Sequence, residues 1–178
     1  MNPAGCSFNS HPPVNRMTYL IHDVPLIPQQ LDMACWYASA QMVIQWRRRS
    51  RRMCEMGLLD PSEDGSLVAQ FKSNNGLSVS SVVDLAKRVG FQPVPPMTPT
   101  LEALESWLRT YGPLWFAGLV PSGHAMVITG INSSGLHIND PWPPRAGQRR
   151  LMPIEEFVKV LQPLGSKELA PNFLHLPF

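Results

Sequence analysis

The sequence has few cysteines. Cys6, Cys35 and Cys54 are the only three in 178 residues, and their wide, odd-numbered spacing fits neither a disulfide framework nor a zinc site. So small a number is typical of a protein from a reducing compartment, or of one with a single working thiol. A chain of this length can bury a full core without disulfide support. Nothing in the sequence suggests a metal or another cofactor, and we expect none.

Long apolar segments are also missing. No run of 18 apolar residues is present, which argues against a membrane span and against a membrane as partner. Residues 1–16 contain Pro, Asn, Ser and His but no apolar segment of a secretory signal. We expect residues 1–16 to be a flexible leader or the remnant of a delivery module, and residues 17–178 to form one domain.

The chain has little excess charge. Its formal net charge is +2, and without one arginine-rich stretch it would be net acidic, which argues against a nucleic-acid-binding surface. The stretch contains Arg47, Arg48, Arg49, Arg51 and Arg52. We interpret it as the solvated end of a helix, where cations are favourable. The alternatives are a docking patch for an acidic protein and, less well supported, nuclear targeting or contact with nucleic acid.

Periodicity predicts helices in the first part of the chain and strands in the second. We expect helices at 33–53, with Asp32 as N-cap, and at 79–89, 100–110 and 154–161. We expect strands at 17–24, 114–120, 124–131, 135–140, 149–153 and 172–177. Residues 57–78 and 91–99 are expected to be loops. This segregation predicts an α+β fold, with a helical half packed on an antiparallel sheet.

Cys35 lies where the first helix is expected to begin. The free N–H groups and partial positive charge of a helix start favour a thiolate, which is the nucleophilic form of cysteine. A buried core cysteine is the competing interpretation, and position alone does not separate the two. The neighbouring Trp36 is expected to be a core residue.

A thiol nucleophile needs a base, a group that orients the base, and a donor for the oxyanion. His124 opens a predicted strand after a turn, although His22 and His137 are not excluded by spacing. Asp140 ends the next strand and would lie across a hairpin from His124, whereas Asn139 should face the opposite side of the sheet. For the oxyanion donor, Gln29 lies six residues before Cys35, with Gln30 as the competing choice.

Five segments of the chain carry a recognisable pattern: "VPLIPQQLDMACWYAS", "LAKRVGFQPV", "YGPLWFAG", "GHAMVITGI" and "HINDPWP". Through these segments the sequence resembles the papain-like cysteine proteases, above all the short bacterial branches. The segments are similar to the effector proteases that bacteria inject into plant cells or rival bacteria, and also to the bacteriocin-processing peptidases. The resemblance covers roughly residues 18–160, and the Cys-Trp and His segments are its most specific parts.

The resemblance implies a role for each candidate residue. Cys35 becomes the nucleophile, His124 the general base and acid, and Asp140 the orienting residue. Gln29 becomes the oxyanion donor. Trp142 falls where these enzymes place an aromatic that shields the histidine pair from water, with a simple core tryptophan as the alternative.

The implied function is a cysteine endopeptidase that a specialised bacterial system delivers into the cytoplasm of a target cell. Its expected partners are a protein substrate and an immunity protein that blocks the cleft. One alternative is that a protein of the same fold acts as a deamidase, transglutaminase or acyltransferase. A second is a non-catalytic binding module, and a lesser one is a leader peptidase of the bacteriocin type.

Overall fold

The structure is a computed structural model that describes residues 18–50, 58–94, 99–118, 123–161 and 171–177. Its helices are α1 (Cys35–Ser50), the 3-10 helix η1 (Pro61–Glu63), α2 (Gly65–Lys72), α3 (Val79–Val89), α4 (Leu101–Tyr111) and α5 (Ile154–Val160). Its strands are β1 (Tyr19–Leu20), β2 (Gln92–Pro93), β3 (Leu114–Gly118), β4 (His124–Asn132), β5 (Gly135–Asp140), β6 (Gln148–Pro153) and β7 (Phe173–His175). The leader expected at 1–16 lies outside the described residues.

The strands form one antiparallel sheet. Its order is β2-β7-β3-β4-β5-β6, and β1 pairs with β4 beside this path. Strands β4 and β5 are joined by a short turn, β6 follows after the segment 141–147, and β7 returns from the end of the chain to lie beside β3. The α+β class expected from the sequence is therefore confirmed.

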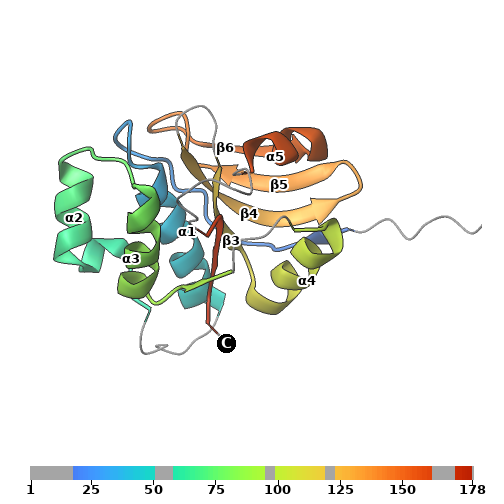
Figure 1. Ribbon diagram of the computed structural model, residues 1–178, viewed down its shortest axis with the longest axis horizontal. Coiled ribbons are helices and arrows are strands. Elements are labelled where there is room, and N and C mark those ends of the chain that lie inside the picture. Colours follow the sequence, from blue (N-terminus) through green and yellow to red (C-terminus); the bar gives the residue numbers. More distant parts are fainter. Residues whose placement is uncertain (1–17, 51–57, 95–98, 119–122, 162–170, 178) are drawn as a thin grey trace, which may run out of the picture.

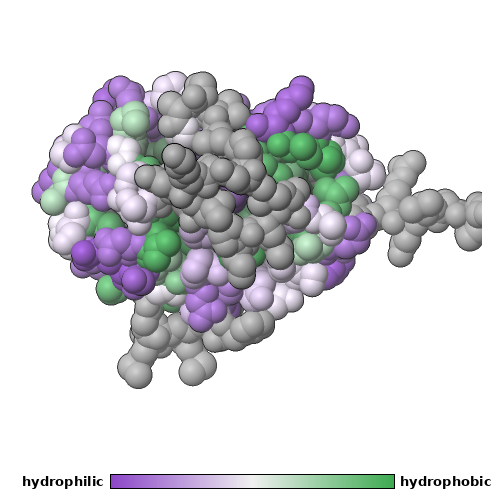
Figure 2. Space-filling model, in the orientation of Figure 1, coloured by the Kyte–Doolittle hydropathy of each residue, from purple (hydrophilic) through white to green (hydrophobic). Residues whose placement is uncertain are grey.

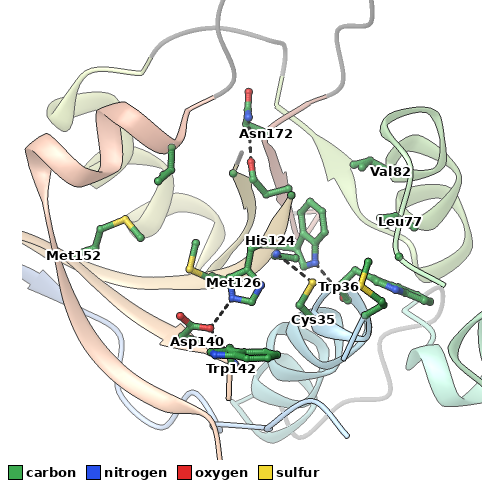
Figure 3. Close-up of a pocket in the computed structure, with 18 of the residues that line it drawn as sticks. Cys35, Trp36, Leu77, Val82, His124, Met126, Asp140, Trp142, Met152 and Asn172 are labelled. Carbon is green, nitrogen blue, oxygen red and sulfur yellow. Dashed lines mark hydrogen bonds and ion pairs between the residues drawn. The ribbon is translucent and has the colours of Figure 1, made fainter. Parts of the chain in front are cut away.

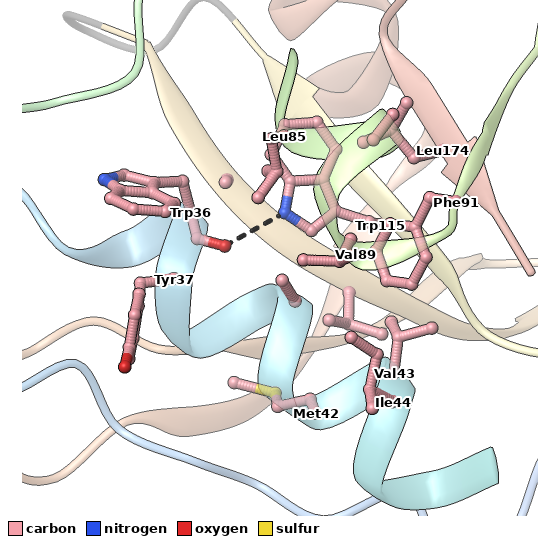
Figure 4. Close-up of a cluster of buried hydrophobic side chains, with 14 of the residues drawn as sticks. Trp36, Tyr37, Met42, Val43, Ile44, Leu85, Val89, Phe91, Trp115 and Leu174 are labelled. Carbon is pink, nitrogen blue, oxygen red and sulfur yellow. Dashed lines mark hydrogen bonds between the residues drawn. The ribbon is translucent and has the colours of Figure 1, made fainter. Parts of the chain in front are cut away.

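Helices cover both faces of the sheet (Figure 1). One face packs on α1 and α3 through a core that includes Trp36, Leu85 and Trp115 (Figure 4). Trp115 Nε1 donates a hydrogen bond to the backbone carbonyl of Trp36 at 3.2 Å, and Trp36 is 1% exposed, as expected of a core residue. The other face packs on α4 and α5 around Phe116 and Phe157. The start of α1 is thereby fixed against the middle of the sheet.

Two expectations for the region around α1 are wrong. The helix begins at Cys35, so its N-cap position is Ala34, and Asp32 lies two residues too early to be the N-cap. The predicted loop 57–78 contains η1 and α2, because Asp60 forms a capping box at η1 and Asp64 accepts hydrogen bonds from two backbone N–H groups at the start of α2. Acidic turn residues that suggested a loop are therefore helix caps.

The arginine-rich stretch is only partly solvated. Arg47 is buried and donates to the backbone carbonyl of Pro177 at 2.9 Å, which ties α1 to the C-terminal segment. Arg48 donates to Glu63 at 2.7 Å and to a backbone carbonyl. The interpretation as a solvated helix end is therefore wrong for Arg47 but agrees with Arg48 and Arg49, which are exposed. Arg51 and Arg52 lie outside the described residues.

Polar side chains dominate the visible surface over α2, whereas a hydrophobic area lies over α5 (Figure 2). Val158 of α5 is 58% exposed. Within the described ranges, no helix combines the length and apolar character needed to cross a membrane.

Candidate active site

A cleft of about 550 Å³ opens between the helical half and the sheet. The helical side contributes apolar side chains from the start of α1 and from α3, and the sheet side contributes β4, β5, β6 and α5 (Figure 3). Cys35, His124, Asp140 and Trp142 all line it. The structure thus brings four of the five predicted site residues into one cavity.

Cys35 is the first residue of α1, and its thiol points into the cleft (Figure 3). It is a free, partly buried cysteine. The backbone N–H of Ala125, which follows His124 on β4, donates to Cys35 Sγ at 3.5 Å. N–H groups in the first turn of a helix have no partners inside the helix, so the sulfur lies in a field that favours negative charge.

His124 and Asp140 form a close pair from neighbouring strands. His124 Nε2 donates to Asp140 Oδ1 at 2.7 Å, and the Asp140 side chain is only 6% exposed. The same oxygen accepts the backbone N–H of Trp142 at 3.0 Å. With Nε2 committed to the carboxylate, Nδ1 is the ring nitrogen that remains for the thiol.

The surroundings of His124 favour its protonated, positively charged form. Burial lowers the pKa of His124, but the hydrogen bond to Asp140, with the hydrogen bond and charge of Cys35, outweighs it and raises that pKa to about 9. Burial raises the pKa of Asp140, but the hydrogen bonds from His124 and Trp142 and the nearby charges keep it below its ordinary value. Asp140 is therefore ionised while His124 is protonated at neutral pH.

Trp142 lies directly after the strand that carries Asp140. The residue is 46% exposed, so it is not a core tryptophan. In Figure 3 it lies beside the His124–Asp140 pair. This position fits an aromatic that limits the access of water to the pair, although the shielding role itself stays a prediction.

Gln29 lies close to Cys35 in the sequence, but it is not among the residues that line the cleft. It is 1% exposed, and its side-chain amide nitrogen donates to the carbonyls of Leu31 at 2.9 Å and Asp32 at 2.8 Å. Both amide hydrogens are thereby used, so Gln29 would have to release one of these carbonyls before it could donate to an oxyanion. Its role as oxyanion donor stays a prediction, and Gln30 instead donates to the carbonyl of Pro28.

The alternatives to Asp140 and His124 that the sequence offered lie away from the cleft. Asn139 faces the opposite side of the sheet, where its amide donates to the carbonyls of Val24 and Pro25. His137 contacts the side chain of Asn132 on the β4–β5 hairpin. The described histidines other than His124 are not among the residues that line the cleft.

Two charged residues of the site were missed by the sequence reasoning. Arg150 of β6 and Glu156 of α5 both line the cleft, and Arg150 Nε donates to Asp140 Oδ2 at 3.3 Å. No local motif indicated them, because their distance to Asp140 depends on the pairing of β5 with β6. In the described part of the chain, no cluster of three or more His, Cys, Asp or Glu residues could hold a metal ion.

Comparisons with known proteins give one family match and two structural neighbours. Residues 19–162 match the family model described as "Papain-like cysteine protease AvrRpt2". The fold is similar to a crystal structure of a C39-like peptidase from Bacillus anthracis, with 17% identity over 83% of this chain and 92% of that one, and a TM-score of 0.51. The double glycine motif protease of an AMS/PCAT transporter, solved with its leader peptide, shares 16% identity over 92% of this chain and 96% of that one, with a TM-score of 0.38. No curated protein matches the chain.

Proposed function

Because the chain belongs to the AvrRpt2 family of papain-like cysteine proteases, and is therefore a cysteine peptidase, we propose that it cleaves peptide bonds through a triad of Cys35, His124 and Asp140. The observation that supports this triad is the meeting of the three side chains in one cleft. The thiol comes from a helix start, the imidazole and the carboxylate come from adjacent strands, and the last two are joined at 2.7 Å.

The reaction begins with a Cys35 thiolate and a His124 imidazolium. The thiolate attacks the peptide carbonyl, and the negative oxygen that forms is stabilised at the N-terminal turn of α1. The imidazolium gives its proton to the leaving amine, which departs and leaves an acyl-enzyme. His124, now neutral, takes a proton from a water molecule that releases the acyl group and restores the ion pair. Asp140 keeps the ring oriented throughout.

Peptide cleavage can be tested with a mixed peptide library and mass spectrometry. Wild-type protein should produce new termini, whereas Cys35→Ala and His124→Ala should produce none. Cys54→Ala is the matched control, since it removes a thiol elsewhere in the chain and should leave cleavage unchanged. A change of peptide mass without fragments would instead favour a deamidase, and a covalent adduct would favour an acyltransferase.

The same activity would serve an effector that is delivered into a target cell. This part of the proposal is supported by the sequence similarity to injected bacterial effector proteases. Delivery by a specialised system and action in the target-cell cytoplasm both follow from that role. Its substrate would be an intracellular protein of the target cell.

Expression inside cells tests the effector role separately from the chemistry. Wild type and Cys35→Ala should be expressed at equal levels in the cytoplasm of a bacterium and of a plant cell. Growth arrest or cell death with wild type alone is the expected result in one of the two hosts. If both variants are harmless in both hosts, while the wild type still cleaves library peptides, the enzyme assignment stands and the toxin role falls.

An effector that acts on other bacteria would need a protein that protects the producing cell. The cleft offers such an immunity protein two exposed apolar side chains near Cys35, because Met33 is 43% and Trp142 46% exposed and both line the cleft. A protective protein that covers this cleft should block alkylation of Cys35 when it binds. Unchanged alkylation in a stable complex would place its binding surface elsewhere.

A further inference from the structure

The Asp140 carboxylate is held from two sides. One oxygen, Oδ1, accepts from His124 and from the backbone of Trp142. The other, Oδ2, accepts from Arg150 Nε at 3.3 Å, and within the described part of the chain this is its only hydrogen bond. A carboxylate that binds a histidine through one oxygen can still rotate about its Cβ–Cγ bond, unless the second oxygen is also fixed.

Arg150 is itself fixed. Its Nη1 donates to Glu156 Oε1 at 2.7 Å, and its Nη2 contacts Met126 Sδ at 3.7 Å. Three nitrogens of one rigid guanidinium therefore contact β5, α5 and β4 at the same time. Strand register explains the geometry, because Arg150 pairs with Ile138 and so lies on the same face of the sheet as Asp140.

We propose that Arg150 is a positioning residue of the catalytic site, which holds the Asp140 carboxylate in line with His124, and that Glu156 in turn holds Arg150. This inference rests on the proposed triad and adds two residues to it. Arg150 touches neither the thiol nor the imidazole, so it acts through Asp140. The Arg150–Glu156 pair also limits how much positive charge reaches the triad, since the two charges partly cancel.

The charges of Arg150 and Glu156 act on the His124–Asp140 pair with opposite signs. The charged or titratable groups around the pair are Cys35 from α1, Arg150 from β6, Glu156 from α5 and Asp32 at the rim of the cleft. Without the Arg150 cation, the Asp140 carboxylate stabilises the His124 imidazolium more strongly. Without the Glu156 anion, Arg150 attracts the carboxylate more strongly, and the imidazolium is stabilised less.

The two substitutions should therefore shift the titration of His124 in opposite directions. Arg150→Gln should raise the pKa of His124, and Glu156→Gln should lower it. Each shift should be about half a unit, which is less than the one to three units of a direct ion pair because the charges act across the carboxylate. A purely structural role would not produce shifts of opposite sign.

The experiment is an NMR titration of histidine-labelled protein, from neutral to alkaline pH, with His124 assigned from its loss in His124→Asn. Arg149→Gln is the matched control: the neighbouring arginine faces the other side of the sheet and donates to the carbonyl of Val24. It should leave the titration unchanged. Arg150→Lys keeps the charge but not the planar fork, so it should keep the pKa of His124.

A second readout is the hydrolysis of a p-nitrophenyl ester of an N-acylated glycine. Both Arg150→Gln and Arg150→Lys should lower kcat by about tenfold, which is the lower end of the loss seen when a partner that orients a metal-binding histidine is removed. Opposite shifts with a flat Arg149→Gln control would support the inference. If Asp140→Asn moves the titration of His124 but Arg150→Gln and Glu156→Gln do not, Arg150 has no positioning role. If Asp140→Asn also has no effect, the proposed triad fails as well.

Discussion

Replacement of Asp140 by asparagine gives the sharpest test of the triad. Asparagine keeps the size of the side chain and can still accept the His124 N–H, but it removes the charge that stabilises the imidazolium. A carboxylate in direct contact shifts the pKa of its partner by about one to three units, which corresponds to roughly 1.4–4 kcal/mol. The pKa of His124, about 9 in the wild type, should fall by that amount in Asp140→Asn.

The direction of the pH effect follows from the sign of this shift. A histidine with a raised pKa is protonated below that pKa and loses its proton above it, so the wild-type imidazolium persists up to a pH of about 9. In Asp140→Asn it should be lost at lower pH, nearer the ordinary value for histidine. Asp140→Ala should behave like Asp140→Asn in its titration but should also lose the orientation of the ring.

Alkylation of Cys35 measures this titration without a known substrate. Iodoacetate and iodoacetamide both react with the thiolate, but only the negatively charged iodoacetate is attracted by the imidazolium. The ratio of the two rates on the peptide that contains Cys35 should therefore fall as His124 loses its proton. An equal midpoint in wild type and Asp140→Asn would contradict this expectation, because Asp140 would then not stabilise the imidazolium.

Three further predictions concern stability. Gln29→Leu removes an amide that donates to two backbone carbonyls, and it should lower the free energy of unfolding by about 1–3 kcal/mol in urea titrations, with a fold that remains cooperative. Gly112→Ala places a Cβ 2.5 Å from the Trp46 ring at a φ of +86°, and it should cost about 3 kcal/mol or more in thermal unfolding, whereas Gly123→Ala, at φ +82° with nothing within 4 Å, should cost less. Burial raises the pKa of Asp60, but the hydrogen bonds from Ser62, Gln41 and Gln45 outweigh it and lower that pKa. The contribution of Asp60 to stability is therefore present above its pKa in the unfolded chain and is lost as pH falls through its pKa in the folded protein. Asp60→Asn should therefore flatten the loss of stability with acid, as seen in urea midpoints measured at several pH values.

Much of the fold was predictable from local patterns. The helix at 79–89 and the strand at 135–140 match the structure at both ends. Ser78 caps the helix and Gly90 takes the left-handed conformation that ends it, while a two-residue turn precedes the strand and Pro141 follows it. The segment around α2 was not predictable in this way. Asp60 and Asp64 favour turns and helix caps for the same reason, since their side chains accept backbone N–H groups.

Long-range pairing explains the other differences. The two residues of β2 form a strand only because Gln92 lies opposite His175 at the far end of the chain. The contact of Arg150 with Asp140 likewise depends on strand pairing, and the amide of Gln29 is used up by a local loop that the residue types do not reveal. Candidate nucleophile, base and carboxylate could be identified from residue type and spacing, but their supporting contacts could not.

The choice between Asn139 and Asp140 illustrates where sequence reasoning ends. Strand alternation correctly places the two residues on opposite faces, but it does not say which of them faces His124. From the turn, Asn132 pairs with Gly135, and an unbroken register would place Asp140 opposite Val127. Val127 packs on the α1 face, so Asp140 would then point away from His124.

A register shift between Ile128 and Gly130 reverses this outcome. One extra residue on β4 changes the parity of the pairing, so that Val127 lies opposite Asn139 and the carboxylate of Asp140 falls on the His124 face. Glycine at 130 fits the same place, since a Cβ there would lie 2.6 Å from the carbonyl oxygen of Tyr19 on β1. A single extra residue in β4 thus determines which side chain of β5 can bind His124.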